Sequence, residues 1–423
     1  MKRTIFHIDV NSAFLSWEAV YRLHFLGGRL DLREIPAAIG GDAAMRHGII
    51  LAKSLAAKKF GVRTGESILE ARKKCPDLYL APPNYGLYER CSHAFMEILR
   101  EYTPVVEPYS IDEAFMDVTE AEAAGEEPVK LANTIKDRIC RELGFTVNVG
   151  VSSNKLLAKM ASDFQKPDLV HTLFPEEIPV KLWPLPVEDL FLVGRATGKK
   201  LRNMGIFTIG ELAATDRQVI RSHLKKPGEQ IWRYANGLDE APVQQEAPEN
   251  KGYGNSTTIA FDVTDARTAK VVLLGLAETV CSRLRRHHVK AGLVSVSIKD
   301  FQLATVSHQK VLNNATHVTN EIYQAACSLF DELWNGSPIR HLGIHTGRIQ
   351  NESASRQLDL FSGASYEKWE QMDQTVDTIR SRFGMDAVKR ASFLEEANRQ
   401  IDHLSGGISR EKRTVDYQKI KID

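Results

Sequence analysis

Three carboxylates have the chemistry and the positions to bind a divalent metal. Asp9 follows an apolar stretch in HIDVNSAF, and Asp112 and Glu113 are adjacent in YSIDEAFMD. Because successive strand residues point to opposite faces, this adjacent pair can share a site only at a turn or a distorted strand. Hard oxygen ligands of this kind favour Mg²⁺, and two such ions would stabilise both oxygens of a phosphoryl transfer. A single acid at a strand end is more often simply solvated, so the metal hypothesis requires all three to meet.

The first 151 residues show a pattern that would bring these acids together. Strands are predicted over Thr4–Val10, Val105–Tyr109, Ala114–Val118 and Phe145–Val151, and amphipathic helices over Leu87–Tyr102 and Val129–Leu143. This order is β-α-β-β-α-β, the ferredoxin-like arrangement, with residues 12–82 inserted after the first strand. If the first strand lies beside the hairpin that contains Ser-Ile-Asp-Glu, Asp9 comes within reach of Asp112 and Glu113.

The rest of the chain predicts further units. A Pro-rich stretch at 174–190 precedes a helical region over about 186–238, and a polar stretch at 241–254 marks a second boundary. A second α+β unit follows, with a strand over 292–301 and helices over 265–289 and 318–334. A final helix is predicted around 366–400, and its apolar stripe (Trp369, Met372, Val376 and Ile379) is expected to pack on the body of the protein.

Composition limits the classes of protein to consider. The 423 residues suggest about three domains, and 43% hydrophobic with 26% charged residues is ordinary globular composition. No apolar run is long enough for a membrane span, and five widely spaced cysteines favour reduced thiols in a cytoplasmic protein. Net charge is +1, but residues 251–350 hold 11 Lys/Arg against 7 Asp/Glu, which permits a polyanionic partner and equally fits a solvated basic face.

Four motifs together resemble a known family. HIDVNSAF, ILAKSLAAKKFGVRTGE, YSIDEAFMDV and GVSSNKLLAKMASDFQKP are similar, in order and spacing, to motifs of the bacterial Y-family (translesion) DNA polymerases of the DinB/UmuC group. The resemblance implies an α+β multidomain fold shaped like a right hand. Its parts would be a ferredoxin-like palm (1–11 and 83–173), fingers (12–82), a helical thumb with a helix-hairpin-helix (174–240), an α+β little finger (250–350) and a C-terminal tail (351–423).

The resemblance also implies roles for residues of the palm. Asp9 and Asp112 would ligate both of two Mg²⁺ ions, Glu113 the ion that activates the primer 3′-hydroxyl, and the Val10 carbonyl the nucleotide-bound ion. Phe14 matches the steric gate, a ring against C2′ of the incoming sugar that excludes ribonucleotides. Without the family context, Phe14 would be read as a core residue of a helix.

The phosphate-binding residues depart in part from the family pattern. Lys166 matches a triphosphate-binding lysine, whereas Lys58 stands where the family usually has arginine and Leu55 where it commonly has tyrosine. Lys53, two residues before Leu55, is a candidate to compensate for it, and a solvated helix face formed by Lys53 and Lys58 is the equally good alternative. The bulky Ile49 and Leu51 replace the small residues often found in the roof of the fingers.

Two further segments resemble binding motifs. Residues 190–212 are similar to a helix-hairpin-helix, in which Gly194, Lys199 and Lys200 would bind a DNA phosphate, although Ala196 replaces the second glycine. The pentapeptide Gln357-Leu358-Asp359-Leu360-Phe361 resembles the bacterial sliding-clamp motif, with Gln357 making polar contacts and Leu358, Leu360 and Phe361 filling an apolar groove.

The resemblance implies a template-directed DNA polymerase that copies across lesions. Its synthesis would be distributive and of low fidelity, and its role would be in DNA damage tolerance. The enzyme would be a cytoplasmic monomer that uses primer-template DNA, dNTPs, two Mg²⁺ ions and the sliding clamp. One alternative is a catalytically silent relative that tethers repair proteins to the clamp; the three retained carboxylates weigh against it. Another is a nucleotide cyclase, which would have no use for the thumb-like and little-finger-like segments.

Overall fold

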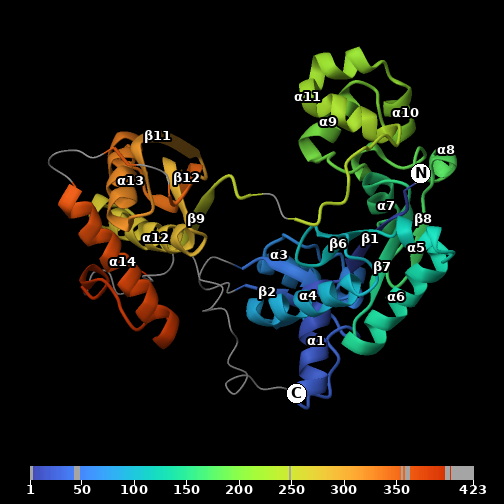
Figure 1. Ribbon diagram of the computed structural model, residues 1–423, viewed down its shortest axis with the longest axis horizontal. Helices are drawn as coiled ribbons and strands as arrows, with labels where there is room; N and C mark the ends of the chain where they lie inside the picture. The colour runs from blue at the N-terminus through green and yellow to red at the C-terminus, as the bar shows by residue number, and fades with distance from the viewer. Residues whose placement is uncertain are drawn as a thin grey trace.

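The computed structural model describes residues 3–41, 48–246, 249–353, 356–357, 363–395 and 401. Its strands form three sheets, with orders β5-β6-β1-β7-β8, β3-β2-β4 and β11-β10-β12-β9. Figure 1 shows the first two sheets and a helical unit on one side, and the third sheet with its helices on the other, joined by an extended segment. Among the described residues, no helix is both long and apolar enough to span a bilayer.

The five-stranded sheet confirms the predicted ferredoxin-like order. Its strands are β1 (Ile5–Val10), β5 (Val106–Pro108), β6 (Glu113–Asp117), β7 (Val147–Ser152) and β8 (Val170–Thr172). The first strand β1 pairs antiparallel with both β6 and β7, and β8 extends the sheet in parallel with β7. The hairpin strand β6 therefore lies directly beside β1, as the sequence predicts.

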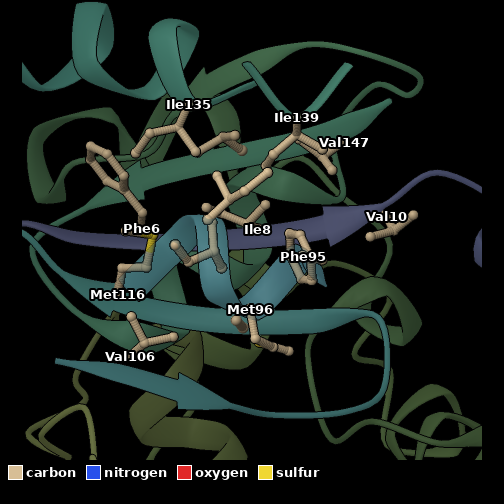
Figure 2. Close-up of a cluster of buried hydrophobic side chains, with 14 of the residues drawn as sticks. Phe6, Ile8, Val10, Phe95, Met96, Val106, Met116, Ile135, Ile139 and Val147 are labelled. Carbon is tan, nitrogen blue, oxygen red and sulfur yellow. The ribbon is translucent and has the colours of Figure 1, made fainter. Parts of the chain in front are cut away.

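Helices cover both faces of this sheet. One face packs against α4 (Tyr85–Arg100) and α6 (Pro128–Leu143), where Phe6, Ile8 and Phe95 meet in the core drawn in Figure 2. The other face carries Ile5, His7 and Asp9 and packs against α7 (Lys155–Ser162). Both faces of β1 are thus buried, which places Asp9 between the sheet and a helix. The Asn84 side chain caps the start of α4, three residues before the predicted Leu87.

The insertion after β1 forms a small α+β unit. Its elements are α1 (Ala13–Phe25), β2 (Ala37–Gly40), β3 (Ile50–Lys53), α2 (Leu55–Lys59), α3 (Ile68–Lys74) and β4 (Tyr79–Ala81). The short helix α5 (Thr119–Ala123) follows β6. Since α1 begins three residues after β1, the insertion leaves the sheet next to Asp9.

The helical region comprises α8 (Ile178–Lys181), α9 (Arg195–Asn203), α10 (Ile209–Ala214) and α11 (Arg217–Ala235). Two 3₁₀ turns, Pro175–Glu177 and Val187–Asp189, connect them. This unit has its own apolar core, shared with α7 through Leu156, Leu157 and Met160. The helix α11 is interrupted at Lys225, where φ is 57°, two residues before Pro227.

The last sheet confirms the predicted second α+β unit. It contains β9 (Tyr253–Val263), β10 (Val289–Asp300), β11 (Thr305–Thr316) and β12 (Ile339–Asn351). The helices α12 (Ala266–Arg286) and α13 (Thr319–Leu333) pack on the sheet and enclose a third apolar core. The strand β11 lies at the sheet edge and is exposed over most of its length.

The final helix differs from the prediction. The helix α14 spans Gly363–Phe383 and is followed by Gly384, whose φ of 91° ends the helical conformation; a 3₁₀ turn covers Ala391–Phe393. Its apolar stripe is only partly buried, while Asp373 and Arg380 are almost fully buried. Arg285 binds Asp373 at 3.1 Å and Glu278 binds Arg380 at 2.9 Å. Ion pairs between α12 and α14 therefore help to hold α14 against the rest of the protein. The spacing of apolar residues in the sequence does not predict these ion pairs.

Candidate active site

The carboxylates predicted from the sequence meet at one end of the central sheet. Asp9 on β1 is paired in register with Glu113, the first residue of β6. The backbone N–H of Val10 donates to the Asp112 carbonyl at 3.0 Å, so Asp112 lies in the turn just before that strand. Asp112 lies in the turn and Glu113 begins the strand β6. This change from turn to strand allows two adjacent residues to face the same site, as the sequence analysis requires.

Lysines of α7 and the following loop bind two of these carboxylates. Lys166 lies 2.5 Å from Asp9 and 2.9 Å from Asp163, while Lys159 lies 3.1 Å from Glu113. Asp112 instead accepts a hydrogen bond of 2.6 Å from the Ser110 hydroxyl. Ammonium groups thus balance the buried negative charge of Asp9 and Glu113.

The two paired carboxylates differ in acidity. Burial raises the pKa of Asp9 to about 7, although the Lys166 charge acts in the opposite direction. Burial also opposes ionisation of Glu113, but its contacts with His7 and Lys159 lower its pKa to about 2. Because burial lowers the pKa of His7, the imidazole is neutral near neutral pH, and Lys159 is the cation that Glu113 faces.

The oxygen atoms of the three carboxylates are chemically suited to bind a hard cation. Asp9, Asp112 and Glu113 supply carboxylate oxygens, the ligands that Mg²⁺ prefers, and Asp9 is a buried carboxylate whose charge calls for a cation. In the described part of the chain, no three His, Cys, Asp or Glu side chains are already grouped closely enough to hold a metal ion. Lys159 and Lys166 contact the oxygens that a metal would use.

A cavity of about 250 Å³ opens beside these acids. Its walls come from the end of β1, the start of α1, the strand β3 and the turn before β6. The lining residues are Asp9, Val10, Ser12, Ala13, Phe14, Leu51, Ala52, Lys53, Thr64 and Asp112. The cavity therefore brings the predicted metal ligands Asp9 and Asp112 next to the predicted gate Phe14.

Phe14 has a fixed environment at this cavity. Its ring stacks on Tyr88 with centroids 4.6 Å apart and meets Tyr85 edge-on at 5.9 Å. The ring is partly buried, so one part packs on α4 while another faces the cavity. Such packing restricts how far the ring can move aside.

The predicted phosphate-binding lysines do not form one cluster. Lys53 lines the cavity, donates to Thr64 at 3.2 Å, and has a pKa lowered by burial and by the nearby Lys58 charge. Lys58 is exposed on α2 and is not among the cavity-lining residues, whereas Lys166 contacts Asp9. Leu51 also lines the cavity, while Ile49 and Leu55 are largely exposed.

The other predicted binding residues lie away from this cavity. Gly194 is the N-cap of α9, and Lys199 and Lys200 are exposed on that helix. The exposed Gln357 is held through its backbone by Asn314, at 2.9 and 3.2 Å. Leu358, Leu360 and Phe361 lie outside the described residues.

Sequence reasoning missed two residues of the site. His7 is fully buried, with Nε2 at 3.6 Å from Glu113 and Nδ1 at 2.7 Å from the Ser162 hydroxyl. Lys159 also lies above the rings of Tyr109 and Phe191, at 5.5 and 5.7 Å. The signals were present: His7 is two residues before Asp9 on the same strand face, and Lys159 lies seven residues before Lys166 within one motif.

Comparison with known proteins gives concordant results. The impB/mucB/samB family model matches residues 8–163, its C-terminal domain model matches 250–360, and the IMS family HHH motif matches 175–206. The chain is 44% identical to DNA polymerase IV of Clostridium acetobutylicum, covering 94% of this chain and 99% of that protein. It is 37% identical to DNA polymerase IV 1 of Bacillus subtilis, covering 93% and 94%. A solved Y-family DNA polymerase chimera shares the fold, with a TM-score of 0.71, 22% identity, and coverage of 82% of this chain and 99% of the chimera.

Proposed function

Because this chain belongs to the impB/mucB/samB family and is a DinB-like Y-family DNA-directed DNA polymerase, we propose that it extends primers across damaged template by two-metal nucleotidyl transfer from dNTPs. The observation that carries the proposal is the meeting of Asp9, Asp112 and Glu113 at one end of the central sheet, beside a cavity that also contains Phe14. Low fidelity, distributive synthesis and a role in damage tolerance are proposed from the resemblance in the four motifs.

The carboxylates would hold two Mg²⁺ ions together with the Val10 carbonyl. The side chains of Asp9, Asp112 and Glu113 would supply carboxylate oxygens, the ligands that Mg²⁺ prefers. The bound ions supply Lewis-acid stabilisation of the charge on the attacking and leaving oxygens. Lys166, which contacts Asp9, would donate to the triphosphate oxygens of the substrate.

Phe14 would discriminate against ribonucleotides. Its ring faces the cavity and is supported from behind by Tyr88 and Tyr85. A 2′-hydroxyl on the incoming sugar would clash with the Phe14 ring, because Tyr85 and Tyr88 restrict the movement of that ring. The clash would exclude rNTPs. Lys53 lines the same cavity and would contact phosphate oxygens, whereas Lys58 is exposed outside the lining and would contact the substrate only beyond it.

DNA contacts would come from the remaining units. We assign 1–11 and 83–173 to the palm, 12–82 to the fingers, 174–240 to the thumb, 250–350 to the little finger and 351–423 to the C-terminal tail. Gly194 at the start of α9, with the exposed Lys199 and Lys200, would bind a backbone phosphate without reading sequence. The net positive charge of 251–350 supports backbone contacts by the little finger.

Sliding-clamp binding is proposed for Gln357, Leu358, Leu360 and Phe361. The Asn314 contacts fix the backbone of Gln357 while leaving its side chain exposed, which suits a residue that contacts a partner. A cytoplasmic location and a monomeric state complete the proposal.

The test is primer extension by the purified chain with Mg²⁺ and dNTPs, on undamaged template and on template with one abasic site. We expect the wild type to extend both primers and an Asp112→Asn, Glu113→Gln double variant to lose extension on both. A matched control, Glu97→Gln with Glu101→Gln, removes two exposed charges from the surface near α4 and should extend like the wild type.

Three outcomes separate the parts of the proposal. Undiminished extension by the double variant would refute the assigned metal site. Extension of undamaged template that stops at the abasic site would refute lesion bypass but not polymerase activity. A wild type as inert as the double variant, both still binding the clamp, would favour the tethering alternative.

A further inference from the structure

A second cavity, of about 480 Å³, lies at the opposite end of α1 from the active-site cavity. It is bounded by the C-terminal half of α1, the first half of α4 and the end of α6. Figure 1 shows the lower ends of α1 and α6 close together, and Gly144, which follows α6, approaches Val20 of α1. The volume falls within the range of about 300–1,000 Å³ typical of binding sites. We call this cavity the α1–α4 groove.

The walls of the α1–α4 groove are mostly apolar and aromatic. Trp17 is fully buried, with its ring edge-on to Phe145 at 6.1 Å, and Tyr21 stacks on Phe25 at 5.5 Å. Leu87 and Ala94 of α4 complete the apolar lining. Phe25 is 73% exposed and lies at the open edge of this aromatic lining.

One buried polar atom of the groove lining lacks a partner. The Trp17 indole N–H has no hydrogen-bond acceptor among the described residues. Buried tryptophan N–H groups are usually paired, because an unpaired donor costs free energy. Because Trp17 has no exposed surface, an occupant would reach this N–H only if the neighbouring side chains moved apart.

The rim of the groove carries two arginines and a histidine. Arg90 on α4, Arg141 on α6 and His24 on α1 are all exposed around it. The acid in the lining, Glu142, is already bound by Arg138 at 2.9 Å and lies 3.5 Å from Arg141. The unneutralised charge is therefore positive, which favours an occupant with carboxylates beside its apolar group.

The α1–α4 groove shares no lining residue with the active-site cavity. The nearest lining residues of the two cavities are Phe14 and Trp17, whose ring centroids lie 6.0 Å apart, and the groove extends from Trp17 towards the C-terminal end of α1. An occupant of the groove would therefore not compete with the nucleotide.

We propose that the α1–α4 groove binds a peptide segment of a partner protein, one that inserts a leucine or an aromatic side chain flanked by Asp or Glu. The open groove with arginines on two separate helices, α4 and α6, fits an extended or helical segment whose carboxylates are spaced along it. The C-terminal residues 402–423 do not fit this description, because they carry five Lys/Arg against four Asp/Glu.

The experiment selects binders from a phage-displayed library of random dodecapeptides, panned on the full-length protein with counter-selection on an Ala94→Trp variant, whose new ring would fill the groove. We expect the enriched peptides to share an apolar anchor next to acidic residues. In fluorescence polarisation, both Ala94→Trp and the Arg90→Glu, Arg141→Glu double variant should weaken binding of these peptides at least tenfold. Arg100→Glu, which reverses an exposed charge on α4 outside the groove, should leave it unchanged.

Several results would overturn the proposal. They are a failure to enrich any peptide, a consensus without acidic residues, or equal affinity for the wild type and Ala94→Trp. Self-association of the protein that Ala94→Trp abolishes would assign the groove to a second copy instead. Primer extension by the same variants is expected at the wild-type rate and shows that they are folded, so the outcome is independent of the catalytic proposal.

Discussion

At the residue scale, the active site is organised by charge pairs between distant parts of the sequence. Asp9 and Lys166 are 157 residues apart, and Glu113 and Lys159 are 46 apart, yet both pairs are within 3.1 Å. Each buried carboxylate needs a counter-charge, because an isolated buried charge is very unfavourable. Lys166 and Lys159 supply these counter-charges.

A first prediction concerns Lys166. Replacing it by methionine (Lys166→Met) keeps the apolar stem but removes the charge that we assign to the triphosphate. A charge-assisted hydrogen bond contributes about 1.5–3 kcal/mol, so KM for the dNTP should rise by roughly tenfold or more. Steady-state primer extension at varied dNTP concentration measures this. Lys181→Met, on α8, should leave KM unchanged. A fall in kcat with an unaltered KM would show instead that Lys166 acts only on Asp9.

At the element scale, the close packing of α7 on the sheet sets the position of Lys159. Gly150 in β7 leaves no room for a side chain: a Cβ there would lie 1.9 Å from the Ala158 carbonyl oxygen and 2.5 Å from the Ser162 nitrogen. Both contacts are backbone atoms of α7, so the whole helix would have to move. The absence of a side chain at Gly150 thus allows α7 to approach Glu113.

The second prediction follows from this contact. Gly150→Ala should destabilise the protein by about 3 kcal/mol, at the upper end of the range for overpacking, and should greatly reduce primer extension because Lys159 shifts with α7. Thermal unfolding and the extension rate are the measurements. Gly347→Ala in β12 is the control, since its nearest new contact is an ordinary 3.7 Å. An unchanged melting temperature for Gly150→Ala would show that α7 can adjust without cost.

At the scale of the whole molecule, separate apolar cores divide the chain into units that each present a different surface. The central sheet, the helical unit and the last α+β unit have their own buried clusters. Figure 1 shows the last unit set apart from the others, linked by the segment after α11. Contacts with a long polyanion would therefore be shared between units rather than concentrated in one pocket.

The third prediction tests this division through salt dependence. Lys199→Ala with Lys200→Ala should weaken binding of a primer-template and make the plot of log K against log salt less steep by roughly 1–2, since each lost phosphate contact contributes about 0.9. Fluorescence anisotropy at several salt concentrations gives the slope. Lys130→Ala with Lys181→Ala is the matched control and should keep the wild-type slope. A slope that is unchanged in the Lys199, Lys200 variant would remove α9 from the DNA-binding surface.

The sheet order and the three acids can be predicted from the sequence. In the central unit, hydrophobic residues repeat every two residues in the strands and about every 3.6 residues in the helices. Such a repeat is visible within a short stretch of sequence, so these elements can be predicted without knowing the fold. The helix-hairpin-helix and the second α+β unit were predictable for the same reason. The family could also be identified, because its four motifs are contiguous in the sequence.

The groups that surround those acids, and the surfaces that remain open, depend on how the elements pack in three dimensions. The lysine partners of Asp9 and Glu113, and the ion pairs that hold α14, join residues far apart in the sequence, so no local pattern identifies them. The α1–α4 groove likewise needs three helices to form it. Ion pairs and cavities depend on distances between elements, and those distances are set when the cores pack.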